Sequence, residues 1–189
     1  KMNCIYLHTG AMYRTVGLLA VRTNTARHDD AALAELLKNA DIRVLRVDGS
    51  QHMALGGEDV EKLIRTPEIS MAASDVASCP SVRRALVALQ QKIAAGCDVV
   101  MDGRDIGTRV LPDADYKFFL TASDKVRAQR RYDELKAKGE SVTLQEVLED
   151  VRRRDEQDTT RAESPLTIAD DATEVETDDL GIDEVVTVL

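Results

Sequence analysis

Charged residues gather at the end of one short apolar run near the middle of the chain. Residues 99–101 have the length and β-branching of a buried strand, and Asp102, Arg104 and Asp105 follow at once. Ligands bind beyond the carboxyl ends of parallel strands, where charges are costly unless a polar or charged ligand meets them. Gly103 lets the backbone turn closely around such a ligand. The pattern predicts a ligand site, although a solvated strand-to-helix turn would explain the same residues.

A second group of cations lies in residues 124–161, a segment rich in charge and poor in large apolar side chains. It fits two helices joined near residues 139–141. Its arginines are Arg127, Arg130, Arg131, Arg152, Arg153, Arg154 and Arg161. A helical hairpin with few core residues has little to anchor it, and lids are drawn from such weakly packed segments. We therefore expect a mobile lid; a surface hairpin laced with i,i+4 ion pairs is a compatible interpretation.

Further arginines lie on two predicted helices outside this segment. The helix over residues 11–22 carries Arg14 in its first turn, where the helix dipole disfavours a cation. Arg14 is therefore either solvated or directed at an anion. The helix over residues 81–95 repeats apolar residues every three or four positions, with Arg83 and Arg84 beside that face. Periodicity does not choose between these two.

The order of the elements indicates an α/β fold. Strand-like runs at residues 4–7, 98–101 and 116–120 alternate with helical patterns. Strand–helix–strand units imply right-handed crossovers and a parallel sheet. Residues 42–55 instead alternate apolar with polar side chains around an Asp-Gly turn signal, which predicts an antiparallel hairpin. We interpret this hairpin as an insert rather than a second domain.

Composition limits the possible functions. The 189 residues are 43 % hydrophobic, which is enough for one domain with a full core. The net charge of -9 argues against general electrostatic binding to nucleic acid or to an anionic membrane. The three cysteines have no metal-ligand spacing and indicate a reducing compartment. No leader and no long apolar run is evident. We therefore expect a cytoplasmic protein, and no heptad pattern or large apolar patch argues against a monomer.

Several separated motifs carry a resemblance to a known family. In chain order they are Thr9-Gly10-Ala11-Met12-Tyr13-Arg14, Ile64-Arg65-Thr66-Pro67-Glu68, Ala73-Ser74-Asp75-Val76-Ala77, Val82-Arg83, Asp102-Gly103-Arg104-Asp105-Ile106-Gly107-Thr108, and Arg153-Arg154-Asp155 through Asp158 to Arg161. On these motifs the chain resembles the bacterial cytidylate kinases, members of the nucleoside monophosphate kinases. The resemblance covers essentially the whole chain in order, and the combination of motifs is specific although each one alone is weak.

The resemblance implies an α/β fold of the P-loop kinase type. A parallel sheet would be flanked by helices and would carry a small insert that binds the nucleoside monophosphate (NMP) and a helical lid. Residues 1–189 would form a single kinase domain. Its expected parts are the core (1–40 and 80–120), the NMP-binding insert (41–79), the lid (123–162) and the C-terminal part of the core (163–189). The implied reaction transfers the γ-phosphoryl group of ATP, accompanied by Mg²⁺, to CMP and dCMP, giving ADP and CDP or dCDP.

The chain departs from the family in one large way. Such kinases begin with a strand, a Gly-rich phosphate loop (P-loop) ending in Gly-Lys-Ser/Thr, and a helix, and no such loop occurs in this sequence. We expect this unit of about 25 to 30 residues to be absent from the chain. A smaller departure is His8, where the family usually has Asp. Two alternatives stay open: a CMP-binding module without catalysis, and a monophosphate kinase that prefers UMP.

The resemblance also implies site residues. The implied catalytic groups are Arg104, Arg131, Arg154 and Arg161, and the implied ATP-binding groups are Arg127 and Arg131. The implied substrate-binding residues are Thr9, Tyr13, Arg14, Ser74, Arg83, Asp102, Gly103, Asp105 and Asp158. No protein side chain is implied as a metal ligand. The implied partners are therefore ATP and CMP or dCMP alone, without nucleic acid or membrane.

The chemistry of cytosine suggests how some of these residues act. Asp105 would accept a hydrogen bond from the N4 amino group, where uracil presents a carbonyl that repels a carboxylate. Arg83 would donate to N3 and O2, and Ser74 would complete this edge. Asp158, held by Arg154, would accept from a ribose hydroxyl. The phosphate of CMP and the transferring group would meet Arg14, Arg104, Arg154 and Arg161, because guanidinium groups stay charged and can grip two phosphate oxygens at once.

Overall fold

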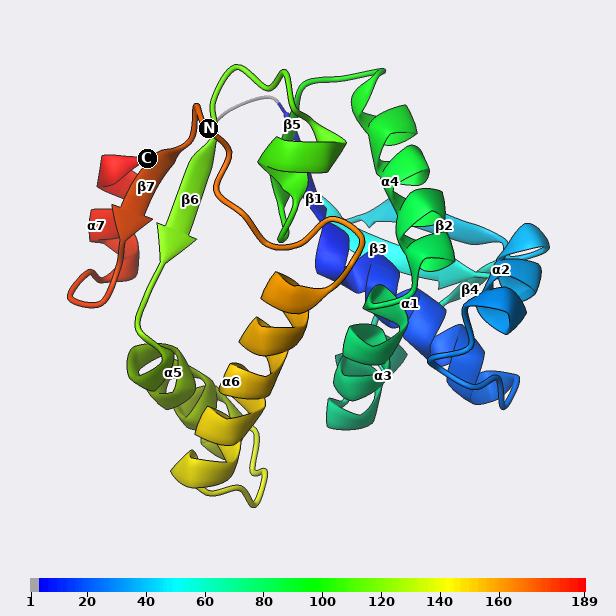
Figure 1. The fold of residues 1–189 in the computed structure, drawn as a ribbon, viewed down its shortest axis with the longest axis horizontal. Coiled ribbons are helices and arrows are strands. Elements are labelled where there is room, and N and C mark those ends of the chain that lie inside the picture. Colours follow the sequence, from blue (N-terminus) through cyan, green and yellow to red (C-terminus); the bar gives the residue numbers. More distant parts are fainter. Residues whose placement is uncertain (1–3) are drawn as a thin grey trace.

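The structure of the chain is a computed structural model that describes residues 4–189 (Figure 1). Its elements in chain order are β1 (Ile5–His8), α1 (Thr9–Arg22), α2 (Asp30–Lys38), β2 (Ile42–Val47), β3 (Ser50–Leu55), β4 (Glu58–Asp59), the 3-10 turn η1 (Leu63–Arg65), α3 (Pro67–Ala77), α4 (Pro80–Ala94), β5 (Val99–Asp102), the π-helical turn η2 (Ile106–Val110), β6 (Phe118–Thr121), α5 (Asp124–Ala137), α6 (Leu144–Thr160), β7 (Thr173–Glu176) and α7 (Ile182–Val188).

The parallel strands form two separate pairs. β1 pairs with β5 and β6 pairs with β7, both in parallel register. The expectation of a single sheet containing β5 and β6 is therefore wrong for residues 4–189, in which these strands do not pair. Their connection contains one turn of π-helix and no longer helix, and β6 pairs with β7 instead.

The predicted hairpin is present as an antiparallel sheet of β2, β3 and β4. Its turn places Asp48 and Gly49 at positive φ, as the Asp-Gly signal predicts. Gln51 on β3 ties the hairpin to the core: its carboxamide accepts from the backbone N–H of His8 at 2.6 Å and donates to the carbonyl of the same residue at 3.2 Å. The hairpin is thus fixed beside the end of β1.

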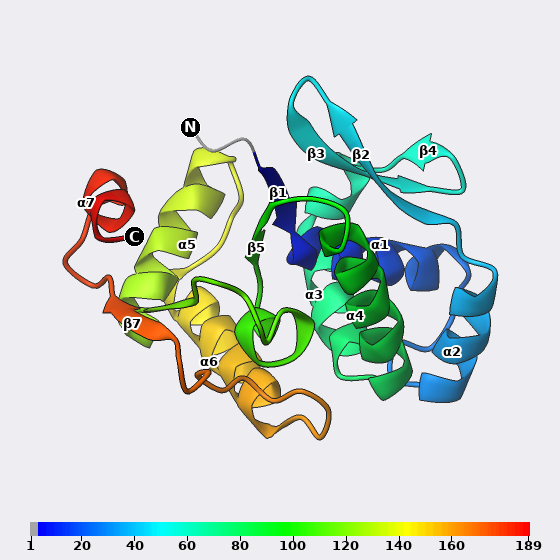
Figure 2. The same cartoon turned by 90° about the horizontal axis from the view of Figure 1, so that it is seen from above.

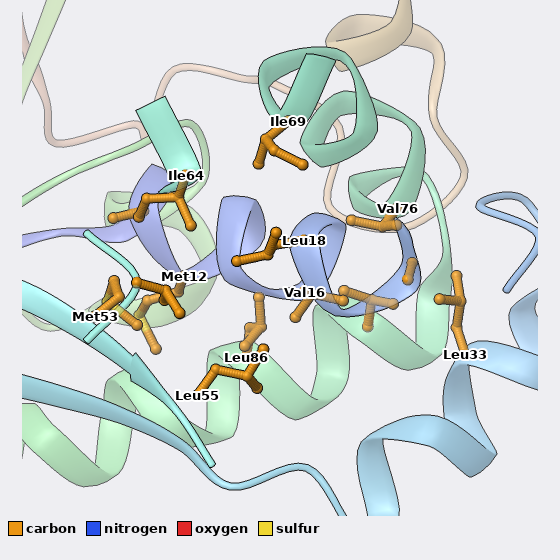
Figure 3. Close-up of a cluster of buried hydrophobic side chains, with 14 of the residues drawn as sticks. Met12, Val16, Leu18, Leu33, Met53, Leu55, Ile64, Ile69, Val76 and Leu86 are labelled. Carbon is orange, nitrogen blue, oxygen red and sulfur yellow. The ribbon is translucent and has the colours of Figure 1, made fainter. Parts of the chain in front are cut away.

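Helix α1 runs through the centre of the hydrophobic core. Its side chains Met12, Val16 and Leu18 pack among α3, α4, η1 and the hairpin, as Figure 3 shows. Gly17 permits the close crossing of α1 and α3, since a Cβ there would lie 3.0 Å from the backbone nitrogen of Ala73. Burial of this apolar face holds α1 in place.

Helices α5 and α6 lie to one side of this core, as Figures 1 and 2 both show. They pack mainly on each other, and only Ala128 and Val147 of their side chains are buried. Ser123 caps α5, and Thr143 caps α6 in a capping box with Glu146. Among the described residues, no helix is long and apolar enough to cross a membrane.

Candidate active site

A buried ion pair lies where α4 faces the end of β5. The Nη2 of Arg83 donates to Oδ2 of Asp105 at 2.5 Å, and both residues are buried, with exposed fractions of 2 % and 4 %. The Nη1 of Arg83 donates to the carbonyl of Ala77 at 3.2 Å. Arg84 is exposed. The structure therefore decides between the two neighbouring arginines, which the sequence pattern leaves open.

Tyr13 of α1 stacks under this pair, with the guanidinium of Arg83 at 5.4 Å from its ring centroid. Burial, moderated by the nearby positive charge of Arg83, raises the pKa of Tyr13 to about 12. The phenol oxygen is buried and has no hydrogen-bond partner among residues 4–189. The phenol therefore stays neutral and leaves a buried donor unused.

Ser74 of α3 contacts α6. Its hydroxyl donates to the carboxamide oxygen of Gln157 at 2.8 Å. This bond joins α3 to α6, next to Asp158. Gln157 is a residue that the sequence analysis missed; its only signal was its position in the turn that carries Asp158.

Asp158 bridges two arginines. One carboxylate oxygen accepts from Nε of Arg104 at 3.0 Å and the other from Nη1 of Arg161 at 2.7 Å. The expectation that Arg154 holds Asp158 is wrong, because the Nη2 of Arg154 donates instead to Ser70. Arg161 lies two turns beyond Arg154, at the end of α6, and its side chain is 5 % exposed. Burial, with the nearby charge of Arg83, lowers the pKa of Arg161.

Two further arginines converge on Ser70 in the first turn of α3. Arg14 donates through Nη2 and Arg154 through Nη2, each at 3.0 Å from the Ser70 hydroxyl oxygen. Arg14 also donates to the carbonyl of Ile64 at 3.0 Å. Burial and then the charges of Arg65, Arg154 and Arg131 lower the pKa of Arg14 to about 10. Ser70 lies one turn before Ser74, and this spacing could have signalled it.

The end of β5 carries a different set of contacts. Asp102 accepts from Nδ1 of His8 at 2.8 Å, and its backbone carbonyl accepts from the hydroxyl of Thr9 at 2.8 Å. Burial opposes ionisation of Asp102, but hydrogen bonding and attraction from His8 hold its pKa below its ordinary value. Gly103 is required here, since a Cβ would lie 2.5 Å from the Thr9 hydroxyl oxygen.

The predicted ATP-binding arginines make contacts within the α5–α6 hairpin. Arg127 of α5 donates to both carboxylate oxygens of Asp155 on α6, at 2.8 and 2.6 Å. Arg131 pairs with Glu134 one turn later, at 2.9 Å. Both arginines are partly exposed. These ion pairs are interhelical or spaced i,i+3, rather than the i,i+4 pairs that the sequence analysis expected of a surface hairpin. The mobile lid stays a prediction.

Unpaired buried donors are concentrated at the predicted site. Among residues 4–189, the buried side-chain atoms without a hydrogen-bond partner include the Tyr13 hydroxyl, Nε of Arg83, Nε of Arg154 and Nη2 of Arg161. All four belong to residues that the sequence analysis singled out. Because native proteins rarely leave buried donors unpaired, this cluster indicates a place for hydrogen-bond acceptors.

A cavity of about 1040 Å³ opens beside the site, between β1, the β2–β3 hairpin and α4. His8, Asp102 and Arg65 border it, whereas Arg83 and Asp105 do not. No group of three or more His, Cys, Asp or Glu residues able to hold a metal ion occurs in the part of the chain that the structure describes. The half-exposed carboxylate of Asp102 lines this cavity, as does Glu61.

Comparisons with known proteins identify the family of the chain. The family model described as cytidylate kinase matches residues 1–189. The chain is 50 % identical over 181 residues to a cytidylate kinase of Caldanaerobacter subterraneus, covering 96 % of this chain and 79 % of that protein. It is 48 % identical over 186 residues to the one of Carboxydothermus hydrogenoformans (98 % and 84 %), and 46 % identical over 185 residues to the one of Caldicellulosiruptor bescii (98 % and 82 %). The chain therefore belongs to the cytidylate kinase family.

Proposed function

We propose that this chain is a kinase that transfers the γ-phosphoryl group of ATP to CMP, and to dCMP. Membership of the cytidylate kinase family supports the reaction. The observation that carries the assignment of the site is the cluster of buried unpaired donors on Tyr13, Arg83, Arg154 and Arg161. A nucleotide supplies hydrogen-bond acceptors for these donors, both on its base and on its phosphate.

The base would bind at Arg83 and Asp105. Their mutual ion pair fixes both side chains in one orientation and leaves Nε of Arg83 as a free donor for an acceptor on the cytosine edge. Asp105 would accept from the N4 amino group, whereas the uracil carbonyl would face a carboxylate that it repels. Ser74 would exchange its bond to Gln157 for one to the base.

The phosphate would bind where arginines from three elements come together. Arg14 of α1 and Arg154 of α6 already share one acceptor, and Arg161 and Arg104 share Asp158. Phosphoryl transfer requires positioning and charge neutralisation more than covalent chemistry, so convergent guanidinium groups suit it. Asp158 would release part of this network to accept from a ribose hydroxyl.

ATP would approach from the lid side with Mg²⁺ as part of the substrate. Mg²⁺ keeps several waters and uses one or two carboxylates plus phosphate oxygens, so Asp102 suits an outer contact without a dedicated protein cage. Arg127 and Arg131 would reach the triphosphate when the lid moves, with Arg127 leaving Asp155. In this proposal residues 41–79 act as the NMP-binding insert and residues 123–162 as the lid.

Calorimetric titration of CMP and of UMP into the protein tests the base assignment. We expect CMP to bind and UMP to bind at least tenfold more weakly, because a desolvated carboxylate facing a carbonyl costs more than the lost hydrogen bond alone. Asp105→Asn should bring the two dissociation constants together, since its amide can donate to the uracil carbonyl. The exposed Asp98→Asn is the matched control. Equal binding of both nucleotides by the unaltered protein would exclude a cytosine-reading pocket.

A further inference from the structure

Ser70 lies between two half-buried cations, Arg14 and Arg154. It lies in the first turn of α3, is 5 % exposed, and accepts from the Nη2 atoms of both Arg14 and Arg154 at 3.0 Å. Within residues 4–189 neither arginine has a carboxylate within ion-pair distance. Buried charges are normally paired with an opposite charge, so a neutral hydroxyl is a weak substitute.

Electrostatics explain why such a shared acceptor matters. Burial lowers the pKa of both guanidinium groups, and Arg14 also feels Arg154 and Arg131 directly. Like charges that repel will turn away from each other unless a common acceptor holds them. Asp150, one turn earlier on α6, attracts Arg154 and offers it another orientation, although Asp150 already pairs with Arg153.

We propose that Ser70 is a positioning residue for CMP binding: its hydroxyl keeps Arg14 and Arg154 convergent on the place where the phosphate of CMP binds. This inference rests on the proposed function and adds a residue to it. By accepting from one arginine of the core and one of the lid, Ser70 also joins the two parts of the phosphate site across α3. Preorganised cations bind an anion more tightly because less side-chain freedom is lost on binding.

Binding of CMP and of cytidine, which lacks the phosphate, tests this proposal. We expect Ser70→Ala to raise the dissociation constant for CMP about tenfold and to leave that for cytidine within about twofold, because only the phosphate subsite loses preorganisation. Ser70→Thr, which keeps the hydroxyl, should restore CMP binding to within about threefold. The matched control is Ser78→Ala, since Ser78 lies at the end of the same helix and bonds to the carbonyl of Asp75.

The possible outcomes distinguish the role of Ser70 from the proposed function. Equal loss of CMP and cytidine binding in Ser70→Ala, or unchanged CMP binding, would overturn the role of Ser70 and leave the proposed function standing. A wild-type protein that binds cytidine as tightly as CMP would instead overturn the phosphate site, and the role of Ser70 with it.

A measurement without ligand keeps the proposal testable if a variant binds too weakly to titrate. We expect ¹⁵N relaxation of the Nε–Hε groups to show faster motion of Arg14 and Arg154 in Ser70→Ala than in the wild type, with Arg83 unchanged because it keeps its ion pair with Asp105. Unchanged motion of both arginines would overturn the positioning role.

Discussion

Helix α1 and the lid helices differ in how they are held. α1 buries eight of its fourteen residues, whereas α5 and α6 bury one residue each, and two ion pairs that are partly exposed, Arg127–Asp155 and Arg152–Asp124, link α5 to α6. Apolar burial stabilises α1 strongly, while exposed ion pairs contribute little. The two regions nonetheless meet at Ser70, where Arg14 of α1 and Arg154 of α6 converge.

The two regions contribute different groups to the proposed site. The groups proposed to read the base, Arg83 and Asp105, lie on the packed side and are nearly inaccessible to water. The arginines proposed to meet ATP lie on the lid and are partly exposed. Discrimination between bases needs fixed groups, whereas enclosing a phosphoryl group needs a part that can open. The following predictions test whether the packed side also contributes more to the free energy of unfolding than the lid does.

The largest effect should come from breaking the buried ion pair on the packed side. Arg83→Leu leaves the Asp105 carboxylate buried and unpaired, so we expect the free energy of unfolding to fall by about 3–5 kcal/mol. Urea unfolding followed by circular dichroism measures it. Arg84→Leu is the matched control and should change stability by less than about 0.5 kcal/mol, because Arg84 is exposed. Equal effects of the two substitutions would contradict the burial of Arg83.

The same substitution placed in both regions sharpens the comparison. Val16 of α1 is 0 % exposed and Val147 of α6 is 4 % exposed, so each loses two buried methyl groups on substitution by Ala. We expect Val16→Ala to cost about 2–3 kcal/mol, from transfer of the methyl groups plus the cavity. Val147→Ala should cost about 1 kcal/mol or less, because the thinly packed lid can collapse around the lost volume. A larger loss from Val147→Ala would mean that the lid carries part of the core.

The titration of Tyr13 gives a smaller, pH-dependent effect. Below pH 10 the phenol is protonated in both states; between about pH 10 and 12 the unfolded chain loses this proton while the folded chain keeps it. The unfolded state then binds fewer protons, so stability falls as the pH rises, by about 1.4 kcal/mol from this group at pH 11.

Tyr13→Phe should remove that part of the decline. It should leave stability at pH 7 nearly unchanged or slightly higher, because the buried hydroxyl it removes has no partner among the described residues. Urea midpoints measured from pH 8 to pH 11 provide the test. Tyr116→Phe, at a position 83 % exposed, is the control, and an identical alkaline decline in all three proteins would show that Tyr13 is not buried as described.

Local signals in the sequence predicted the elements well. The Asp-Gly turn predicted the β2–β3 hairpin, which the structure confirms. The polar composition of residues 124–161 predicted two helices, seen as α5 and α6. The pairing of strands was harder, because the sequence around η2 does not reveal which strand edges meet, and the single sheet expected for β5 and β6 was wrong.

Motifs in the sequence predicted which residues belong to the candidate site. They did not predict which hydrogen-bond partner each side chain contacts. Arg154 lies on α6 and Arg161 directly follows this helix. Only three-dimensional packing determines that Arg161 donates a hydrogen bond to Asp158 and that Arg154 donates one to Ser70. Ser70 and Gln157 were missed because their only signals are positional: Ser70 lies one turn before Ser74, and Gln157 lies beside Asp158. Their roles depend on the contact between α3 and α6, which helices far apart in the sequence make only after folding.

The smallest effect should come from the ion pair within the lid. Arg127 and Asp155 form two hydrogen bonds but are 38 % and 39 % exposed, so solvent screens their attraction. We expect Asp155→Asn to lower the free energy of unfolding by less than about 1 kcal/mol. Asp150→Asn, which breaks the exposed pair with Arg153 on the same helix, is the control.

Amide hydrogen exchange shows where that small change acts. Exchange in α5 and α6 should be faster than in α1 already in the wild type, and Asp155→Asn should raise it further only in the lid, because weakly packed helices open without unfolding the core. If Asp155→Asn instead destabilised the whole protein as strongly as Arg83→Leu, the lid would be anchored as firmly as α1. The lid arginines could then reach ATP only by breaking the core, which would exclude the opening that the proposed reaction requires.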